Sequence, residues 1–321
     1  SVGPREQHSE KVRNGMLDSL HDYMRVGIVH FMAFPQCMGG VGPLVKTIST
    51  IACDPFFDVI EISHTKSETQ RKEIRALAEQ SRIEVCFGAQ PILLGGGLDL
   101  NHPDNADRAR AIEAVMNAID EAFEVGSKSV AVLSGKVCDD KESAIARLTE
   151  SLMELCEYAK TKAMSVTLET FDQVPFGKNC LIGPAKDAVA VSEAVRKHYP
   201  NFGIMLDLSH LPLQEETPKV AIRTAREHIV HAHIGNCAMD YPHHPAYGDH
   251  HPRFGMPGTR NDVHELAEYL KYLIEVGYLS REKPRVVSFE VKPMPEENPE
   301  AVIAGCKRTL EAAWRRLRAR Q

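Results

Sequence analysis

The sequence lacks a long apolar run, is poor in aromatic residues and carries no excess of basic charge. The 321-residue sequence contains no apolar stretch of about 18 residues, so we expect no membrane-spanning helix. Lys and Arg total 38 and Asp and Glu total 44, which gives a formal net charge of −6. This balance argues against binding to nucleic acid or to an anionic membrane. With 43% hydrophobic and 26% charged residues, the composition is that of a globular protein.

Close cysteine pairs are also missing. The eight cysteines are scattered, with no Cys-x-x-Cys spacing. In a chain of this size, this pattern predicts reduced thiols and a cytoplasmic location. The first residues are polar and have no apolar core, so we expect no secretory signal. We interpret residues 1–23 as an N-terminal arm.

Motifs for nucleotide binding and for nucleophilic catalysis are absent as well. No P-loop and no G-x-G-x-x-G follows a predicted strand, so no nucleotide cofactor is expected. No serine lies in a nucleophile elbow, and no cysteine has a local catalytic signature.

The chain alternates between two kinds of segment. Short apolar runs typical of buried strands lie at residues 24–34, 57–63, 82–88, 129–134, 165–171, 202–210, 229–236 and 285–291. Helix-like segments follow them at residues 42–53, 67–81, 104–125, 141–163, 184–199, 217–228, 261–279 and 298–318. Eight such units, with no strand left over, predict an α/β fold: a (β/α)8 TIM barrel that occupies residues 24–321 as a single domain.

Two connections of this predicted barrel are long. Residues 90–103 follow the third strand and residues 236–260 follow the seventh. Both lie on the C-terminal face of the barrel, where barrel enzymes build their active sites.

Four of the later strands end in residues that can bind a metal ion, namely Glu169, Asp207, His233 and Glu290. If the faces that carry them point into the barrel, three carboxylates and one imidazole converge at its mouth. Such a group must be protonated or must bind a cation. A divalent metal ion is the simplest solution, and the oxygen-rich set favours Mn²⁺, Mg²⁺ or Co²⁺. His231, one layer deeper, is more typical of a hydrogen-bonded core histidine.

A second cluster lies in the loop after the seventh strand. Residues 241–258 contain four histidines together with Asp249 and Arg253. An arginine in a Gly/Pro-rich loop at the barrel mouth can clamp an oxygen-rich ligand, so Arg253 and His251 are predicted to bind substrate. Alternatively, Asp249 and His251 add metal ligands. His64 and Ser134, near the ends of the second and fourth strands, complete the predicted substrate-binding residues.

The segments VTLETFD, MLDLSH, HAHIGN and SFEVKP resemble the xylose isomerase-like barrel superfamily, and the likeness covers nearly the whole chain. This superfamily contains sugar isomerases and epimerases, inosose dehydratase and endonuclease IV. The resemblance implies one divalent metal per chain, Mn²⁺ first and Co²⁺, Mg²⁺ or Zn²⁺ as alternatives, held by Glu169, Asp207, His233 and Glu290. It also implies that Glu169 and Glu290 form the acid/base pair and that His210 and Arg253 face substrate oxygens.

These observations favour a metal-dependent sugar isomerase or epimerase. One glutamate would remove the proton α to a carbonyl, and the other glutamate, or His210, would return a proton. If a β-oxygen leaves instead, the enzyme is a lyase or dehydratase. The long loop after the seventh strand also resembles the metal-bearing subunit of bacterial C-glycoside deglycosidases. We expect a small-molecule sugar as ligand and a homo-oligomer, with a partner subunit as the alternative.

Two other classes are less favoured. An endonuclease IV-like phosphodiesterase needs further histidines on the third and fourth strands, where this chain has Cys86 and Ser134. It would also need a basic groove, which the net charge does not favour. A non-catalytic sugar-binding barrel would have either no metal ion or one without turnover.

Overall fold

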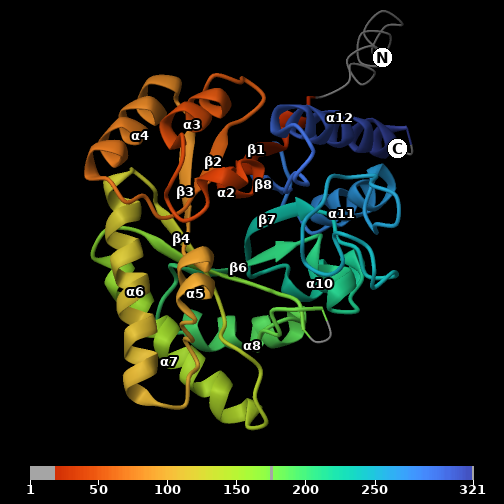
Figure 1. The fold of residues 1–321 in the computed structure, drawn as a ribbon. Helices are drawn as coiled ribbons and strands as arrows, with labels where there is room; N and C mark the ends of the chain where they lie inside the picture. Colours follow the sequence, from red (N-terminus) through yellow and green to blue (C-terminus); the bar gives the residue numbers. More distant parts are fainter. Residues whose placement is uncertain (1–18, 174–175, 320–321) are drawn as a thin grey trace, which may run out of the picture.

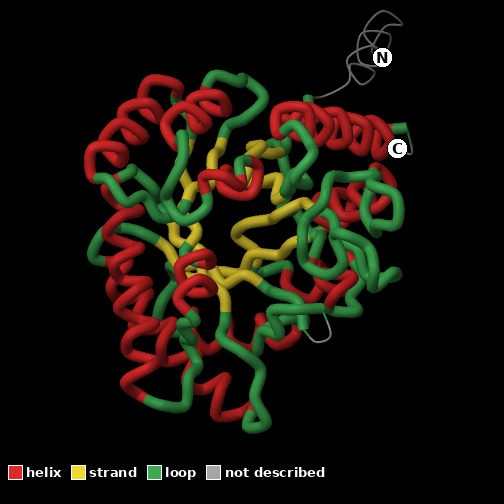
Figure 2. Tube along the Cα trace, in the orientation of Figure 1, coloured by secondary structure: helices red, strands yellow, loops and turns green. Residues whose placement is uncertain are grey.

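The computed structural model describes residues 19–173 and 176–319. Eight parallel strands close into a barrel in sequence order, because β1 pairs with both β2 and β8. Figure 2 shows the strands as a central ring with the helices outside it. The predicted (β/α)8 barrel is therefore confirmed. Residues 1–18 of the predicted arm lie outside the described residues.

The strands are short and almost completely buried, because the helices cover the outside of the barrel and side chains fill its centre. Val, Ile and Leu predominate in them, as packing on both faces requires. Their bounds are β1 Met24–Val29, β2 Val59–Ile62, β3 Glu84–Gly88, β4 Ser129–Leu133, β5 Ser165–Glu169, β6 Phe202–Asp207, β7 Ile229–Gly235 and β8 Arg285–Glu290.

The covering helices begin where the sequence places capping side chains. Ser67 accepts a hydrogen bond from the Gln70 amide at the start of α4, and Asp104 accepts two at the start of α6. Figure 1 shows α4, α6 and α7 along one side of the barrel and α11 and α12 along another. The bounds are α3 Leu44–Ala52, α4 Glu68–Ser81, α6 Asn105–Glu124, α7 Lys141–Lys160, α8 Ala185–Arg196, α10 Pro218–Ala225, α11 Val263–Glu275 and α12 Pro299–Arg318.

Three short helices that the sequence analysis did not predict follow strand ends directly: α2 His30–Ala33, α5 Gln90–Gly96 and α9 His210–Leu213. The predicted first strand therefore ends at Val29 rather than at residue 34. The predicted loop at 90–103 begins as a helix, because Pro91 suits a first turn and Gly97 ends the helix in the left-handed conformation. By contrast, residues 236–262, all of them described, contain neither a helix nor a strand.

Within the described residues, no helix has both the length and the apolar character needed to span a membrane.

Candidate active and metal-binding site

The four predicted metal ligands meet at the C-terminal mouth of the barrel. Glu169, Asp207, His233 and Glu290 come from β5, β6, β7 and β8, and each offers a ligand atom within 4.8 Å of those of the others. His233 Nδ1 lies 2.7 Å from Glu290 Oε2 and 3.4 Å from Glu169 Oε1. All four side chains are buried. We call this group the tetrad.

The donor set of the tetrad fits a divalent cation. Three carboxylates and one imidazole suit Mn²⁺, Co²⁺ or Mg²⁺ by ligand type. Glu169 Oε1 is buried and has no hydrogen-bond partner among the described residues, as expected of an oxygen that faces a cation. The structure thus brings together the predicted ligands in an arrangement that could hold a metal ion.

The pKa values of the two glutamates of the tetrad are shifted in opposite directions. Burial, together with the Glu290 carboxylate, raises the pKa of Glu169 above its ordinary value. Burial also acts to raise the pKa of Glu290, but the charges of His251 and His233 and a hydrogen bond from His233 outweigh it and lower that pKa to about 2. Two carboxyl groups whose pKa values diverge are suited to separate acid and base roles.

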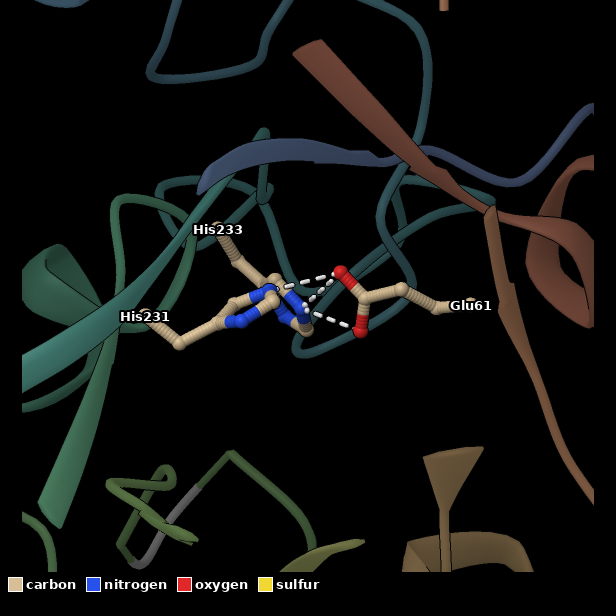
Figure 3. A group of neighbouring side chains, drawn as sticks. All are labelled: Glu61, His231 and His233. Carbon is tan, nitrogen blue, oxygen red and sulfur yellow. Dashed lines mark hydrogen bonds and ion pairs between the residues drawn. The ribbon is translucent and has the colours of Figure 1, made fainter. Parts of the chain in front are cut away.

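Beneath the tetrad, Glu61 of β2 joins two histidines of β7. Its Oε1 lies 2.7 Å from His231 Nε2, and its two carboxylate oxygens lie 3.2 and 3.1 Å from His233 Nε2. Figure 3 shows both imidazole rings turned toward this carboxylate. With a cation in the tetrad, a neutral His233 that donates its Nε2–H to Glu61 would present its Nδ1 lone pair to that cation. The interpretation of His231 as a hydrogen-bonded core histidine is confirmed.

A third group packs beside the tetrad around Asp249 in the loop after β7. Asp249 Oδ1 lies 3.1 Å from His210 Nε2 and 2.7 Å from His251 Nε2. Lys178 forms an ion pair with the other oxygen of Asp249. Burial acts to raise the pKa of Asp249, but the charges of His210, Lys178 and His251 lower it well below its usual range.

These groups adjoin a cavity of about 460 Å³ at the barrel mouth. Its polar wall includes Glu169, Glu290, His251 and Lys178. Gln90 of α5 also lies there and donates a hydrogen bond to Glu169 Oε2 at 2.7 Å. The apolar part of its lining is formed by Val29, Phe31, Met32, Met38, Leu94 and Phe171. A polar end beside an apolar wall is typical of a small-molecule site.

Three residues predicted to bind substrate lie outside this cavity. Arg253 points toward the start of α12, where its Nε donates to Glu297 Oε1 at 2.7 Å. His64 turns outward and bonds Glu121 of α6, with 2.8 Å between Nδ1 and Oε2. Ser134 is buried, and its Oγ accepts a hydrogen bond from the Ile182 amide. In each case, a nearer partner binds the polar group that was expected to face substrate.

The other two predicted substrate residues lie near the tetrad in different ways. His251 lines the cavity, as predicted. His210 is fully buried behind the wall, with its ring centroid 4.6 Å from that of Phe171. The expected contact of His210 with substrate is therefore replaced by packing against Phe171 and an ion pair with Asp249.

Sequence reasoning missed Glu61, Gln90 and Lys178. Glu61 left a signal, since a carboxylate within the apolar run VIEIS needs a partner inside the barrel. Gln90 and Lys178 lie in segments without periodic pattern, so neither had a signal in the sequence.

The fold and site define the class of this protein. The chain matches the model of the xylose isomerase-like TIM barrel over residues 56–312, and it belongs to that family. A relative, D-psicose 3-epimerase of Ruminiclostridium cellulolyticum, is 25% identical over 200 residues, which are 58% of this chain and 64% of that enzyme. The match thus spans less than two thirds of that relative's length.

Solved structures share the fold at lower identity. The structure of L-ribulose 3-epimerase aligns with a TM-score of 0.70 and 20% identity, covering 92% of this chain and 97% of that one. The structure of 3-keto-D-glucoside 4-epimerase from E. coli aligns with a TM-score of 0.63 and 16% identity, covering 89% and 98%. At such identities, the likeness is one of fold.

Proposed function

We propose that this chain is a divalent-metal-dependent sugar epimerase or isomerase that works by proton transfer at the carbon next to a carbonyl. The observation that carries the proposal is the tetrad, in which four ligand side chains from four strands converge beside a cavity. The relatives that bear the names of sugar 3-epimerases support the same class of reaction. Glu169, Asp207, His233 and Glu290 would hold the cation, with Mn²⁺ as the expected metal.

Two glutamates of the tetrad would carry out the two proton transfers. A bound divalent cation would supply Lewis acidity toward a carbonyl oxygen of the sugar. Glu290, held ionised by the histidines beside it, is suited to take the proton from the α carbon. Glu169, whose pKa is raised, is suited to return one. The apolar wall of the cavity limits the access of water to these groups.

Exchange of the α proton with solvent deuterium tests the proposal. Manganese-loaded protein in D₂O is incubated with ketopentoses, ketohexoses and 3-keto-glucosides, and deuterium at the α carbon is measured by NMR. We expect exchange with at least one of these sugars. We expect it to fall by roughly 10²–10⁴-fold in Glu290→Gln, which removes the base.

The matched control is Glu297→Gln, because this glutamate pairs with Arg253 outside the cavity. It keeps the exchange rate. Full exchange in Glu290→Gln would remove the proposed base, and no exchange with any sugar class would overturn the function. An unsaturated product in place of the epimer would make the chain a lyase.

A further inference from the structure

The cavity at the barrel mouth has a neighbouring cavity of about 490 Å³. His250 and Lys292 line both cavities and therefore lie at the boundary between them. Five of the ten residues that line the second cavity are prolines, which make its wall stiff. Its one carboxylate, Glu297, is already bound by Arg253 and by the Met294 amide. The charge left unbalanced at this boundary is therefore the positive charge of Lys292.

The position of Lys292 follows from the sequence around it. It lies two residues after Glu290, the last residue of β8, so an extended chain places both side chains on the same side. Pro293 follows it, and a residue before proline favours an extended backbone. The Lys292 amide also donates a hydrogen bond to the His251 carbonyl oxygen at 2.7 Å. These constraints hold Lys292 at the mouth, one layer beyond Glu290.

The ammonium group of Lys292 has no counter-ion among the described residues. It forms neither an ion pair nor a hydrogen bond with any of them, although four carboxylates line the same cavity. By contrast, Lys178 is paired with Asp249, and Arg253 is paired with Glu297. Lys292 is partly buried, and a partly buried cation without a counter-ion is suited to bind an anion from a ligand.

Two further groups favour an anion next to Lys292. Lys178 lines the same cavity, and its ammonium has three donors, of which Asp249 needs only one. His250 lies near both lysines, because burial and then the charges of Lys292 and Lys178 lower the pKa of its imidazole. A neutral His250 can still donate one hydrogen bond.

We propose that Lys292 binds an anionic group of the substrate, a carboxylate or a phosphate, at the boundary between the two cavities. The inference deepens the proposed epimerase function and rests on it for the sugar part of the ligand. The carbonyl end of such a sugar would lie at the tetrad, and its charged end would lie at Lys292. Lysine binds either anion as a point charge. The expected substrate is therefore a keto-sugar acid or a keto-sugar phosphate rather than an uncharged ketose.

Calorimetric titration of the manganese-loaded full chain tests this site. The ligands are D-fructose, D-fructuronate and D-fructose 6-phosphate, which differ only at carbon 6, and the same three forms of D-tagatose. We expect at least one anionic sugar to bind about tenfold more tightly than its uncharged ketose. In Lys292→Met we expect this advantage to be lost, with the affinity for the uncharged ketose unchanged.

Lys283→Met is the matched control, because this exposed lysine precedes β8 at the opposite end of the barrel. It keeps the advantage. Circular dichroism checks the fold, and Lys292→Gln, with the same expected loss, replaces Lys292→Met if that variant does not fold.

The two anions are distinguished by the ligands themselves. An advantage limited to the uronates identifies a carboxylate, and one limited to the 6-phosphates identifies a phosphate. Equal affinities for charged and uncharged sugars, or an advantage that survives in Lys292→Met, would overturn the proposal. Calorimetry requires no turnover, so tight binding of an anionic sugar without α-proton exchange would keep the anion site and remove the epimerase function.

Discussion

Glu61 supplies no ligand atom to the tetrad, but it holds one of the four ligands in place. Glu61 accepts hydrogen bonds from His231 and His233, and so fixes which nitrogen of His233 faces the tetrad. Burial acts to raise the pKa of Glu61, but the charges of the two histidines lower it well below its usual range. The carboxylate therefore stays ionised and acts as an anchor for the metal-facing imidazole.

We expect Glu61→Gln to weaken binding of Mn²⁺ by about 10–100-fold, as measured by titration calorimetry. The amide of glutamine places a donor against ring nitrogens that themselves donate, so His233 loses its fixed orientation. Glu84→Gln is the control, because this glutamate of the adjoining strand β3 pairs with Arg25 and belongs to none of the candidate metal-binding groups. Equal affinities in the two variants would show that Glu61 has no part in positioning His233.

The sequence was sufficient to predict the tetrad but not its surroundings. Glu169, Asp207 and Glu290 are the last residues of buried strands, and His233 lies two residues before the end of its strand. The alternation of side chains along each strand was therefore enough to predict that the four converge. Arg253 shows the limit of such reasoning. The guanidinium group of Arg253 pairs with the carboxylate of Glu297 instead of facing the cavity. No pattern in the sequence predicts a pair between residues 44 positions apart.

At the scale of elements, strands and long helices were predicted well because each repeats its pattern over several residues. The α4 helix, for example, begins within one residue of the predicted start and ends at Ser81, as predicted. The α2 and α9 helices have four residues each, too few to show helical periodicity. Their helical form depends on tertiary contacts with the barrel, which the sequence does not display.

One of these short helices carries a pH-dependent contact. His30 of α2 is buried, and its Nε2 lies 2.8 Å from Thr47 Oγ1 of α3. Burial lowers the pKa of His30 from 6.5 to about 4. As the pH falls from 6.5 toward 4, His30 is therefore protonated in the unfolded chain but stays neutral in the folded chain. Stability from neutral His30 is fully present above pH 6.5 and is lost through this window.

We expect His30→Gln to remove about 2 kcal/mol of the decrease in unfolding free energy between pH 7 and pH 5. Urea unfolding of both proteins at the two pH values measures it, because the other titrating groups cancel in the comparison. His21→Gln is the control, since this histidine is partly exposed at the barrel's other end. An unchanged difference between the two pH values in His30→Gln would contradict the prediction.

For the molecule as a whole, the barrel concentrates negative charge that folding alone does not balance. The net charge is only −6, yet the strands carry carboxylates of the tetrad to one buried point. Gathering these charges opposes folding, because each loses water and gains like-charged neighbours. A cation that binds only the folded barrel offsets this and stabilises the whole molecule.

Manganese should therefore raise the midpoint of thermal unfolding, Tm. At a free concentration about 100 times its Kd, a single site adds about 2.7 kcal/mol, which corresponds to roughly 4 °C for a chain of this length. In Glu169→Gln, we expect less than half of this shift, because one ligand is lost.

The same variant without metal should unfold at or above the Tm of the unaltered protein, since it removes a buried carboxylate whose pKa is raised by its surroundings. Calorimetry with and without Mn²⁺ measures both effects. A full shift in Glu169→Gln would place the cation elsewhere, and a lower Tm without metal would mean that the carboxylate stabilises the barrel by itself.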